Sequence, residues 1–330
     1  MKQVRLWLGV AVSLVLLGAA FRGVDLGQLG RSLAEVRTGW LVPVLVSIPL
    51  RFWLTALRWQ VLLRPVKTIG VHRLFGVTMI GFMANNILPA RMGEFVRAYA
   101  LGKSESLPAS LSFATIVLER LFDGFTLLAF LVAGVLFLRP ERWLVWSAVA
   151  SFVLYLGVLG GLVWLRQGGA LGWLVARLPA AVRLRVGGPL DSFALGLDVM
   201  GNRRALGTVA ALSLLIWGIN VAGLWAMFAA FDLALPPYAP FLVLAIVAVA
   251  LVLPSAPGYV GTFQVGTVAG LALFAVPEAT ALSLSLLYHA LNYVPITALG
   301  LVYLGTMNLT LGELRAAGTK ARPTAPPWPT

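Results

Sequence analysis

The chain has 330 residues, of which 60% are hydrophobic and only 11% are charged, and its formal net charge is +13. Soluble domains carry about 25% charged residues, so this composition excludes an ordinary soluble globular domain. Several continuous apolar windows of about 18 to 25 residues are long enough to cross a bilayer as helices, whereas barrel strands alternate. The sequence therefore predicts an all-α, polytopic integral membrane protein.

Scarce residue types narrow the classes of function further. The chain has no cysteine, which excludes disulfides, thiolate metal sites and cysteine nucleophiles, and its two histidines, His72 and His289, are far apart. We therefore expect no metal and no cofactor. The basic balance is compatible with nucleic-acid binding, but in a membrane protein the positive-inside rule explains it by basic cytoplasmic loops, so we expect no nucleic-acid partner.

The first apolar segment follows a basic start, MKQVR, and ends near small residues, as in a signal peptide. It fits an uncleaved first span equally, and the many apolar segments after it favour that interpretation. We expect about six full spans, at 4–21, 39–63, 108–138, 143–165, 206–231 and 279–307.

Two further apolar segments are interrupted by Pro and Gly. The segment 74–88 leads into NNILPARMGEFVR (85–97) and a short apolar stretch, 94–102, and 238–253 leads into LPSAPGYVGTF (253–263) and an apolar piece ending near Val276. Both breaks run from an aliphatic residue to Leu-Pro, a small residue, Gly and Phe. Paired breaks in the two halves of a transporter point to its substrate site.

The distribution of basic residues favours re-entrant hairpins at 74–102 and 238–276. With the N-terminus inside and both hairpins re-entrant, fifteen Lys and Arg residues lie on the cytoplasmic side and five outside. If each broken segment crossed once, the six-arginine loop 166–204 would lie outside, against the positive-inside rule. Three spans separate the hairpins, so the hairpins enter from opposite faces and form an inverted-topology repeat whose tips meet near the midplane.

This layout gives one transmembrane domain, residues 1–310, with both chain ends in the cytoplasm. Within it, 166–205 is basic and moderately apolar, and we expect short helices along the cytoplasmic interface, anchored by Trp173. The Pro-rich tail 311–330 is expected to be disordered.

Ionisable side chains at membrane depth cost free energy and are functional candidates. Arginines outnumber acids among them five to three, so a cavity formed by all of them carries surplus positive charge and favours an anion, and the planar guanidinium suits phosphate. Asn85 and Asn86 add neutral donors and acceptors. The eight ionisable residues are Arg51, Arg58, Arg91, Glu94, Arg97, Glu119, Arg120 and Asp123.

Structural explanations compete with this site. Arg58 lies near Arg64 and can extend to the cytoplasmic interface. The acidic residues of LERLFDGF can form an ion-pair network with Arg97 or Arg91, and the two asparagines can cap broken backbone. His289, with Tyr288, Asn292 and Tyr293, is interpreted as interhelical hydrogen bonding rather than as a ligand site.

Three motifs in order, NNILPARMGEFVR, VLERLFDG and LPSAPGYVGTFQ, resemble the lysylphosphatidylglycerol synthase transmembrane region family, whose members are also called flippase-like domain proteins. The resemblance covers about residues 5–310. It implies roles for Asn85, Asn86, Pro89, Arg91, Gly93, Glu94, Arg97, Glu119, Arg120, Asp123, Pro254, Pro257, Gly258, Gly261 and Gln264.

The family resembles the membrane half of proteins that aminoacylate phosphatidylglycerol and then move the product. No aminoacyl-transfer domain follows here, so we expect a flippase for an anionic or aminoacylated phosphate-bearing lipid in a bacterial or archaeal cytoplasmic membrane. The expected binding residues are Asn85, Asn86, Arg91, Glu94, Arg97, Glu119, Arg120, Asp123, Arg51 and Gln264, and the expected hairpin-tip residues are Pro89, Gly93, Pro254, Pro257, Gly258 and Gly261.

Two alternatives stay open. One is an integral membrane enzyme that acts on a polyprenyl phosphate or phospholipid, and the other is a scaffold in a lipid- or glycan-processing complex. Membrane lipids are the expected partners, with a homo-oligomer and a separate lipid- or glycan-processing enzyme left open. The sequence contains no nucleotide-binding motif, so transport would be passive or ion-coupled.

Overall fold

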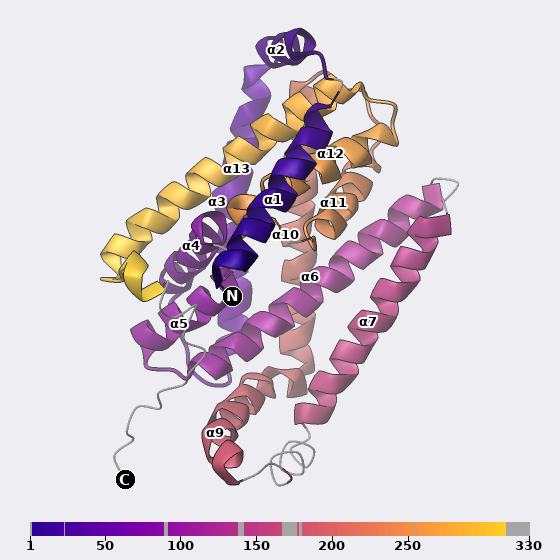
Figure 1. Ribbon diagram of the computed structural model, residues 1–330. Helices are drawn as coiled ribbons and strands as arrows, with labels where there is room; N and C mark the ends of the chain where they lie inside the picture. The colour runs from indigo at the N-terminus through magenta and orange to yellow at the C-terminus, as the bar shows by residue number, and fades with distance from the viewer. Residues whose placement is uncertain are drawn as a thin grey trace.

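The computed structural model describes residues 2–22, 24–88, 92–137, 142–166, 177, 180–253 and 255–314 (Figure 1). Every regular element in these ranges is helical, which confirms the all-α prediction. The elements are α1 (Lys2–Phe21), α2 (Leu26–Ala34), η1 (Thr38–Trp40), α3 (Leu41–Leu63), α4 (Val71–Ile87), α5 (Gly93–Glu105), α6 (Ala109–Phe137), α7 (Arg142–Arg166), α9 (Ala180–Gly196), η3 (Asp198–Gly201), α10 (Arg203–Ala230), α11 (Ala239–Ala250), η4 (Pro257–Tyr259), α12 (Thr262–Ala272) and α13 (Glu278–Thr306).

Each of the six predicted spans is occupied by a helix. By length and apolar composition alone, three of the described helices are able to cross a membrane: α3 with η1, α10 and α13. The bent pair α1 and α2 adds a fourth if it counts as one span. Large apolar side chains on α7, such as Trp146 and Leu154, are 70% and 65% exposed, as lipid-facing residues of a polytopic membrane protein are.

The first broken segment is a helical hairpin, α4 and α5. Leu88 ends α4 in an extended conformation, and α5 starts at Gly93. At the base, Arg73 Nη2 donates to the carbonyl of Ser104 at 3.0 Å, and Lys67 Nζ lies 2.7 Å from Glu105 Oε2. The end of α5 therefore returns to the start of α4.

The close approach of α4 and α5 depends on Gly93. A Cβ on this residue would lie within 2.3 Å of the carbonyl oxygen of Gly81 and 2.5 Å of the Asn85 side chain. No other residue type fits there without moving backbone.

The second broken segment is also a hairpin, formed by α11 and α12. Gly266 and Gly270 of α12 lie against Val247 and Val243 of α11. Gly258 and Gly261 at the tip have φ of +75° and +88°, a region that glycine adopts readily. Ser13 of α1 accepts from Ala256 N and donates to the carbonyl of Val260, both at 2.7 Å, so α1 packs on this tip.

Contacts with α13 show how the two hairpins are arranged. Phe263 of α12 stacks on His289 in the first half of α13, while Gly76 of α4 lies against Tyr303 near its end. Between them, the Tyr293 hydroxyl donates to the carbonyl of Asn86 at 3.2 Å, and its ring lies against Gly258. The hairpins therefore flank opposite halves of α13, at the lower left and upper right of Figure 1, and their tips meet beside its middle.

This arrangement has the geometry expected of two opposed re-entrant hairpins. The sides of the membrane from which they enter, and an inverted repeat relating the two halves, stay predictions.

The structure describes parts of two further predicted segments. In the segment 166–205, α9 and η3 form, and Gly196 lies against the carbonyl of Leu111 on α6, whereas Trp173 lies outside the described residues. Residues 311–314 are helical, with Leu314 buried and Glu313 accepting from Lys103 at 2.8 Å. These residues therefore belong to the packed body, and 315–330 of the predicted tail lie outside the described residues.

The hairpin packing predicts the effect of filling Gly93. Gly93→Ala should lower the free energy of unfolding by about 1 to 3 kcal/mol, because an added methyl overpacks a site with no space. Gly160→Ala is the matched control, since nothing lies within 4 Å of its added Cβ. Thermal unfolding in detergent, followed by tryptophan fluorescence, measures both. Equal melting temperatures for the two variants would contradict the packing.

Candidate functional site

Four buried side chains form an ion-pair network between α3, α5 and α6. Arg58 Nη1 and Nη2 donate to the two carboxylate oxygens of Asp123 at 2.7 and 3.3 Å. Arg97 donates to both oxygens of Glu119, with Nη2 to Oε1 at 3.2 Å. We call Arg58, Arg97, Glu119 and Asp123 the buried network.

The helices place these groups by simple spacing. Glu119 and Asp123 are four residues apart, so they share one face of α6. The guanidinium of Arg97 lies over the ring of Trp59, 3.8 Å from its centroid, and Trp59 Nε1 donates to Thr115 on α6 at 2.8 Å.

A fourth helix, α10, completes the surroundings of Asp123. Ser213 Oγ accepts from Arg58 Nη1 at 2.7 Å, and Trp217 Nε1 donates to Asp123 Oδ1 at 3.0 Å. The buried network is thus the point where α3, α5, α6 and α10 are joined.

Within the network each arginine donates to one carboxylate, and Arg58 Nε also lies 3.9 Å from Glu119 Oε1. Arg58 is 1% exposed and Glu119 0%, so the extension of Arg58 to the interface is wrong, and the ion-pair alternative with Arg97 is confirmed. Two cations and two anions cancel, so these four groups alone have no surplus charge with which to hold an anion. Their geometry accounts for helix packing; whether they also contact a substrate stays a prediction.

Beside the network lies a small polar crevice. Its lining residues are Gly81, Phe82, Asn85, Gly93, Glu94, Arg97 and Arg120. It has room for about 10 Å³, close to one water-sized sphere. Arg120 is 42% exposed at its side chain and lies 3.5 Å from Asp123 Oδ2, and Glu94 is half-buried. The crevice thus presents one guanidinium and one carboxylate outside the buried network.

The two asparagines cap and connect the first tip. Asn85 Oδ1 accepts from Gly93 N at 2.7 Å, which spans the break between α4 and α5. Asn86 Nδ2 donates to Thr297 Oγ1 at 2.9 Å on α13. The backbone-capping alternative is therefore correct for Asn85, whose side chain also lines the crevice.

Gln264 forms hydrogen bonds at the tip of the second hairpin. Its Oε1 accepts from Gly261 N at 2.8 Å, which caps α12. Its Nε2 lies 2.9 Å from His289 Nδ1, and His289 Nε2 lies 2.8 Å from the carbonyl oxygen of Gly258. Since only a ring N–H bonds to a carbonyl, Nε2 carries the proton and Nδ1 accepts from Gln264. The structural interpretation of His289 agrees with these contacts.

Arg51 lies apart from the buried network. Its guanidinium donates to the side-chain oxygens of Asn220 on α10 and Asn292 on α13, the second at 2.6 Å. Arg51 and Arg58 share a face of α3, but seven residues separate them by about 10.5 Å along the axis.

The expected convergence of eight charges is therefore only partly correct. Six of them gather around the network and crevice, Arg51 has other partners, and Arg91 lies outside the described residues, as do Pro89 and Pro254. The six gathered groups comprise three arginines and three acids. The described part of this cluster therefore carries no surplus of positive charge, and the predicted surplus, which counts Arg91, stays a prediction.

Three residues of α10 that bind the side chains of this site were not identified from the sequence. Ser213, Trp217 and Asn220 lie in SLLIWGIN, where the spacing of Ser213 and Asn220 equals that of Arg58 and Arg51. This matching seven-residue spacing on two apolar helices is the signal that points to them.

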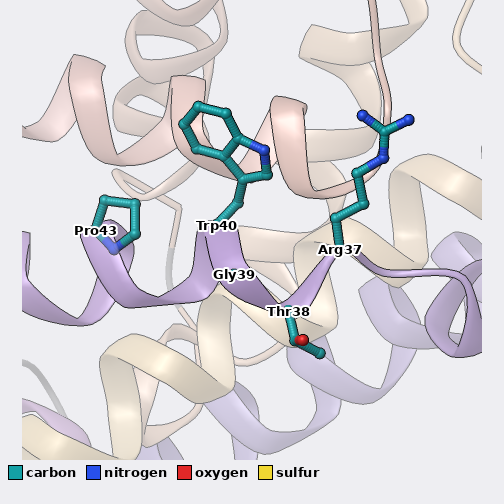
Figure 2. A pocket seen from close by; sticks show the side chains of 5 residues that line it. All are labelled: Arg37, Thr38, Gly39, Trp40 and Pro43. Carbon is teal, nitrogen blue, oxygen red and sulfur yellow. The ribbon is translucent and has the colours of Figure 1, made fainter.

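A larger surface hollow, of about 690 Å³, lies at the start of α3, lined by Arg37, Thr38, Gly39, Trp40 and Pro43 (Figure 2). Trp40 makes an edge-on contact with Trp225, with ring centroids 6.3 Å apart. Tryptophans at span ends are typical of the membrane–water interface. No group of three His, Cys, Asp or Glu suitable for a metal occurs among the residues that the structure describes.

Comparison with known protein families identifies the family of this chain. A profile described as "Lysylphosphatidylglycerol synthase TM region" matches residues 6–300. The chain belongs to this family. No solved structure shows a significant match.

Several curated proteins are similar to this chain. The chain is 29% identical over 276 residues to "Glycosyltransferase AglD" of Haloferax volcanii, a match that covers 72% of this chain and 44% of that protein. UPF0104 membrane proteins of Methanocaldococcus jannaschii and Methanothermobacter thermautotrophicus are 24% and 26% identical, over 80% and 90% of this chain and 82% and 90% of theirs. A further Methanothermobacter relative matches over 45% of its length. The chain thus spans less than half of two relatives and most of two others.

The buried network predicts a large effect for removing one charge. Glu119→Gln leaves Arg97 without a carboxylate in an interior site, and should lower the free energy of unfolding by about 3 to 5 kcal/mol. Arg31→Gln is the control, because it removes an exposed pair with Asp25 at 3.9 Å and should change stability by less than about 1 kcal/mol. Thermal unfolding in detergent compares them. A Glu119→Gln protein as stable as the control would contradict the network's role.

Proposed function

We propose that this protein moves a phosphate-bearing lipid across the cytoplasmic membrane of a bacterium or archaeon, as a transporter rather than an enzyme. One observation carries the proposal: the tips of two opposed hairpins meet beside the middle of α13, next to a crevice where Arg120 and Glu94 lie outside the neutral buried network. Broken helices that meet at membrane depth are typical of transporter substrate sites. Family membership and the archaeal relatives support a membrane lipid- or glycan-related function.

The groups in the crevice suggest how a head group is held. Arg120 binds the phosphate, since its exposed guanidinium keeps donors for a bidentate contact while Asp123 orients it from 3.5 Å. Glu94 accepts from a head-group amine or hydroxyl. The acyl or prenyl tails stay in the bilayer. The crevice has room for about one water, so the helices that line it, α4, α5 and α6, must separate for a head group to enter.

A second candidate is an enzyme that acts on a polyprenyl phosphate or phospholipid. The name of the Haloferax volcanii relative, a glycosyltransferase, favours it, but the match covers only 44% of that protein. Product formation from a sugar-nucleotide donor by purified protein would decide for the enzyme. A scaffold role, which predicts neither transport nor product, has no specific observation in its favour.

Liposomes that contain purified protein and fluorescent phosphatidylglycerol test the proposal. Dithionite should reach labelled lipid of the inner leaflet faster than in protein-free liposomes. Arg120→Gln should slow this movement by about 10-fold or more, because a charge-assisted contact to phosphate is worth about 1.5 to 3 kcal/mol. Arg120→Lys should keep part of the rate.

Arg31→Gln is the control, since it removes an exposed arginine on α2. The melting temperature of each variant shows whether it is folded. Folded Arg120→Gln protein with the wild-type rate would contradict the assignment of Arg120, and wild-type protein without lipid movement would contradict the proposed function.

A further inference from the structure

Arg51 differs from the other described arginines at membrane depth in the partners of its guanidinium. Arg58 and Arg97 each have a carboxylate partner, and Arg120 shares Asp123. Among the described residues, no carboxylate oxygen lies within 4.0 Å of the Arg51 guanidinium. Its partners are two neutral amide oxygens.

These amides are fixed in one orientation. Asn220 Nδ2 donates to the carbonyl of Ile216 at 2.9 Å, and Asn292 Nδ2 donates to the carbonyl of Tyr288 at 2.8 Å. Because each amide nitrogen is used within its own helix, each amide oxygen must face Arg51. The site holds the guanidinium in place without neutralising it.

Donors of Arg51 remain available for a ligand. A guanidinium has five N–H donors, and the two amide contacts use two of them. The buried Nε has no hydrogen-bond partner in the described part of the chain. The side chain as a whole is half-buried, so part of it is open to a ligand.

Electrostatics favour an anion at this place. An unpaired cation at membrane depth is costly, and amide dipoles offset only part of that cost. A guanidinium held only by neutral amides suits the oxygens of a phosphate.

The place of Arg51 in the fold relates it to the crevice. It lies about 10.5 Å, two helical turns, from Arg58 on α3, in the direction away from the first hairpin's base. Asn292, one of its two amide partners, directly precedes Tyr293, where the two tips meet. The Arg51 site therefore lies next to the residue at which the two tips meet.

We propose that Arg51, held by Asn220 and Asn292, is a second binding position for the phosphate of the transported lipid. This inference rests on the proposed function and extends it from one position to two, on the two sides of the junction between the tips.

Asn292→Asp tests the position directly. The substitution keeps the size of the side chain and places a carboxylate where an amide oxygen lies 2.6 Å from Arg51. The introduced carboxylate then pairs with the Arg51 guanidinium and competes with the phosphate of a ligand. We expect the ligand-free protein to remain folded, and the affinity for dioctanoyl phosphatidylglycerol to fall by about 10-fold or more. Asn220→Asp, which acts on the other amide, should give the same result.

Asn202→Asp is the matched control. Asn202 caps α10 by accepting from Arg204 N and Ala205 N at 3.1 Å, and Asp caps a helix equally well. The chemical change and the helix are the same as in Asn220→Asp, but Asn202 is exposed at the end of the helix and has no part in the Arg51 site.

Ligand-induced thermal stabilisation of purified protein in detergent gives the readout. Dioctanoyl phosphatidylglycerol should raise the wild-type melting temperature by several degrees, about 5 °C at saturating ligand, and dioctanoylglycerol, which lacks the phosphate, should not. The shift should be reduced in both Arg51-site variants and unchanged in Asn202→Asp. Wild-type affinity in folded Asn292→Asp and Asn220→Asp would overturn the position. So would inorganic phosphate that binds as tightly as the lipid, because the site would then take free phosphate.

Transport in liposomes separates this inference from the proposed function. Wild-type protein that binds phosphatidylglycerol through Arg51 but moves no lipid would overturn the function and leave the binding position. Lipid movement at the wild-type rate in Asn292→Asp, with unchanged binding, would overturn the position and leave the function.

Discussion

The buried ion pairs on α6 are the interaction on which the rest of the structure depends. Glu119 holds Arg97 of the first hairpin, and Asp123 holds Arg58 of α3, so two carboxylates one turn apart fix three helices at membrane depth. Neither acid nor arginine tolerates the interior without its partner. Because the pairs are neutral together, they have no surplus charge with which to hold an anion, and the charges beside them, Arg120 and Glu94, are those we propose for recognition.

Those charges lie in a crevice of the first hairpin and α6, and the tip of the second hairpin packs against the end of α4. The first hairpin brings Glu94 and Asn85 to this crevice, which Arg120 also lines. Both tips are fixed by side chains from elsewhere, Ser13 of α1 and Tyr293 of α13. Irregular backbone at this depth is stable only when such partners satisfy it. The helix breaks beside the site leave backbone groups unpaired, and the surrounding hydrogen bonds satisfy those groups.

Much of this could be predicted from the sequence. Hydropathy predicted the six spans, and Pro and Gly predicted the breaks at 88–92 and 251–261. The four-residue spacing of Glu119 and Asp123 predicted that they share one face of a helix. The partners of Arg51 and Arg58 could not be predicted, because periodicity fixes the face of a helix and not the helix that faces it. Asn220 and Ser213 looked like ordinary residues of an apolar span. For the same reason the sequence did not show that, among the described residues, Arg51 lies apart from a neutral network.

The most direct measurement of the central claim is the accessibility of the crevice. The chain has no cysteine, so Phe82→Cys puts a single thiol in the crevice wall. The account predicts that a membrane-impermeant maleimide labels this thiol in sealed vesicles, and that dioctanoyl phosphatidylglycerol, but not dioctanoylglycerol, slows the labelling. A thiol that does not react from either side, or that reacts at the same rate with both lipids, would contradict a head-group site in this crevice.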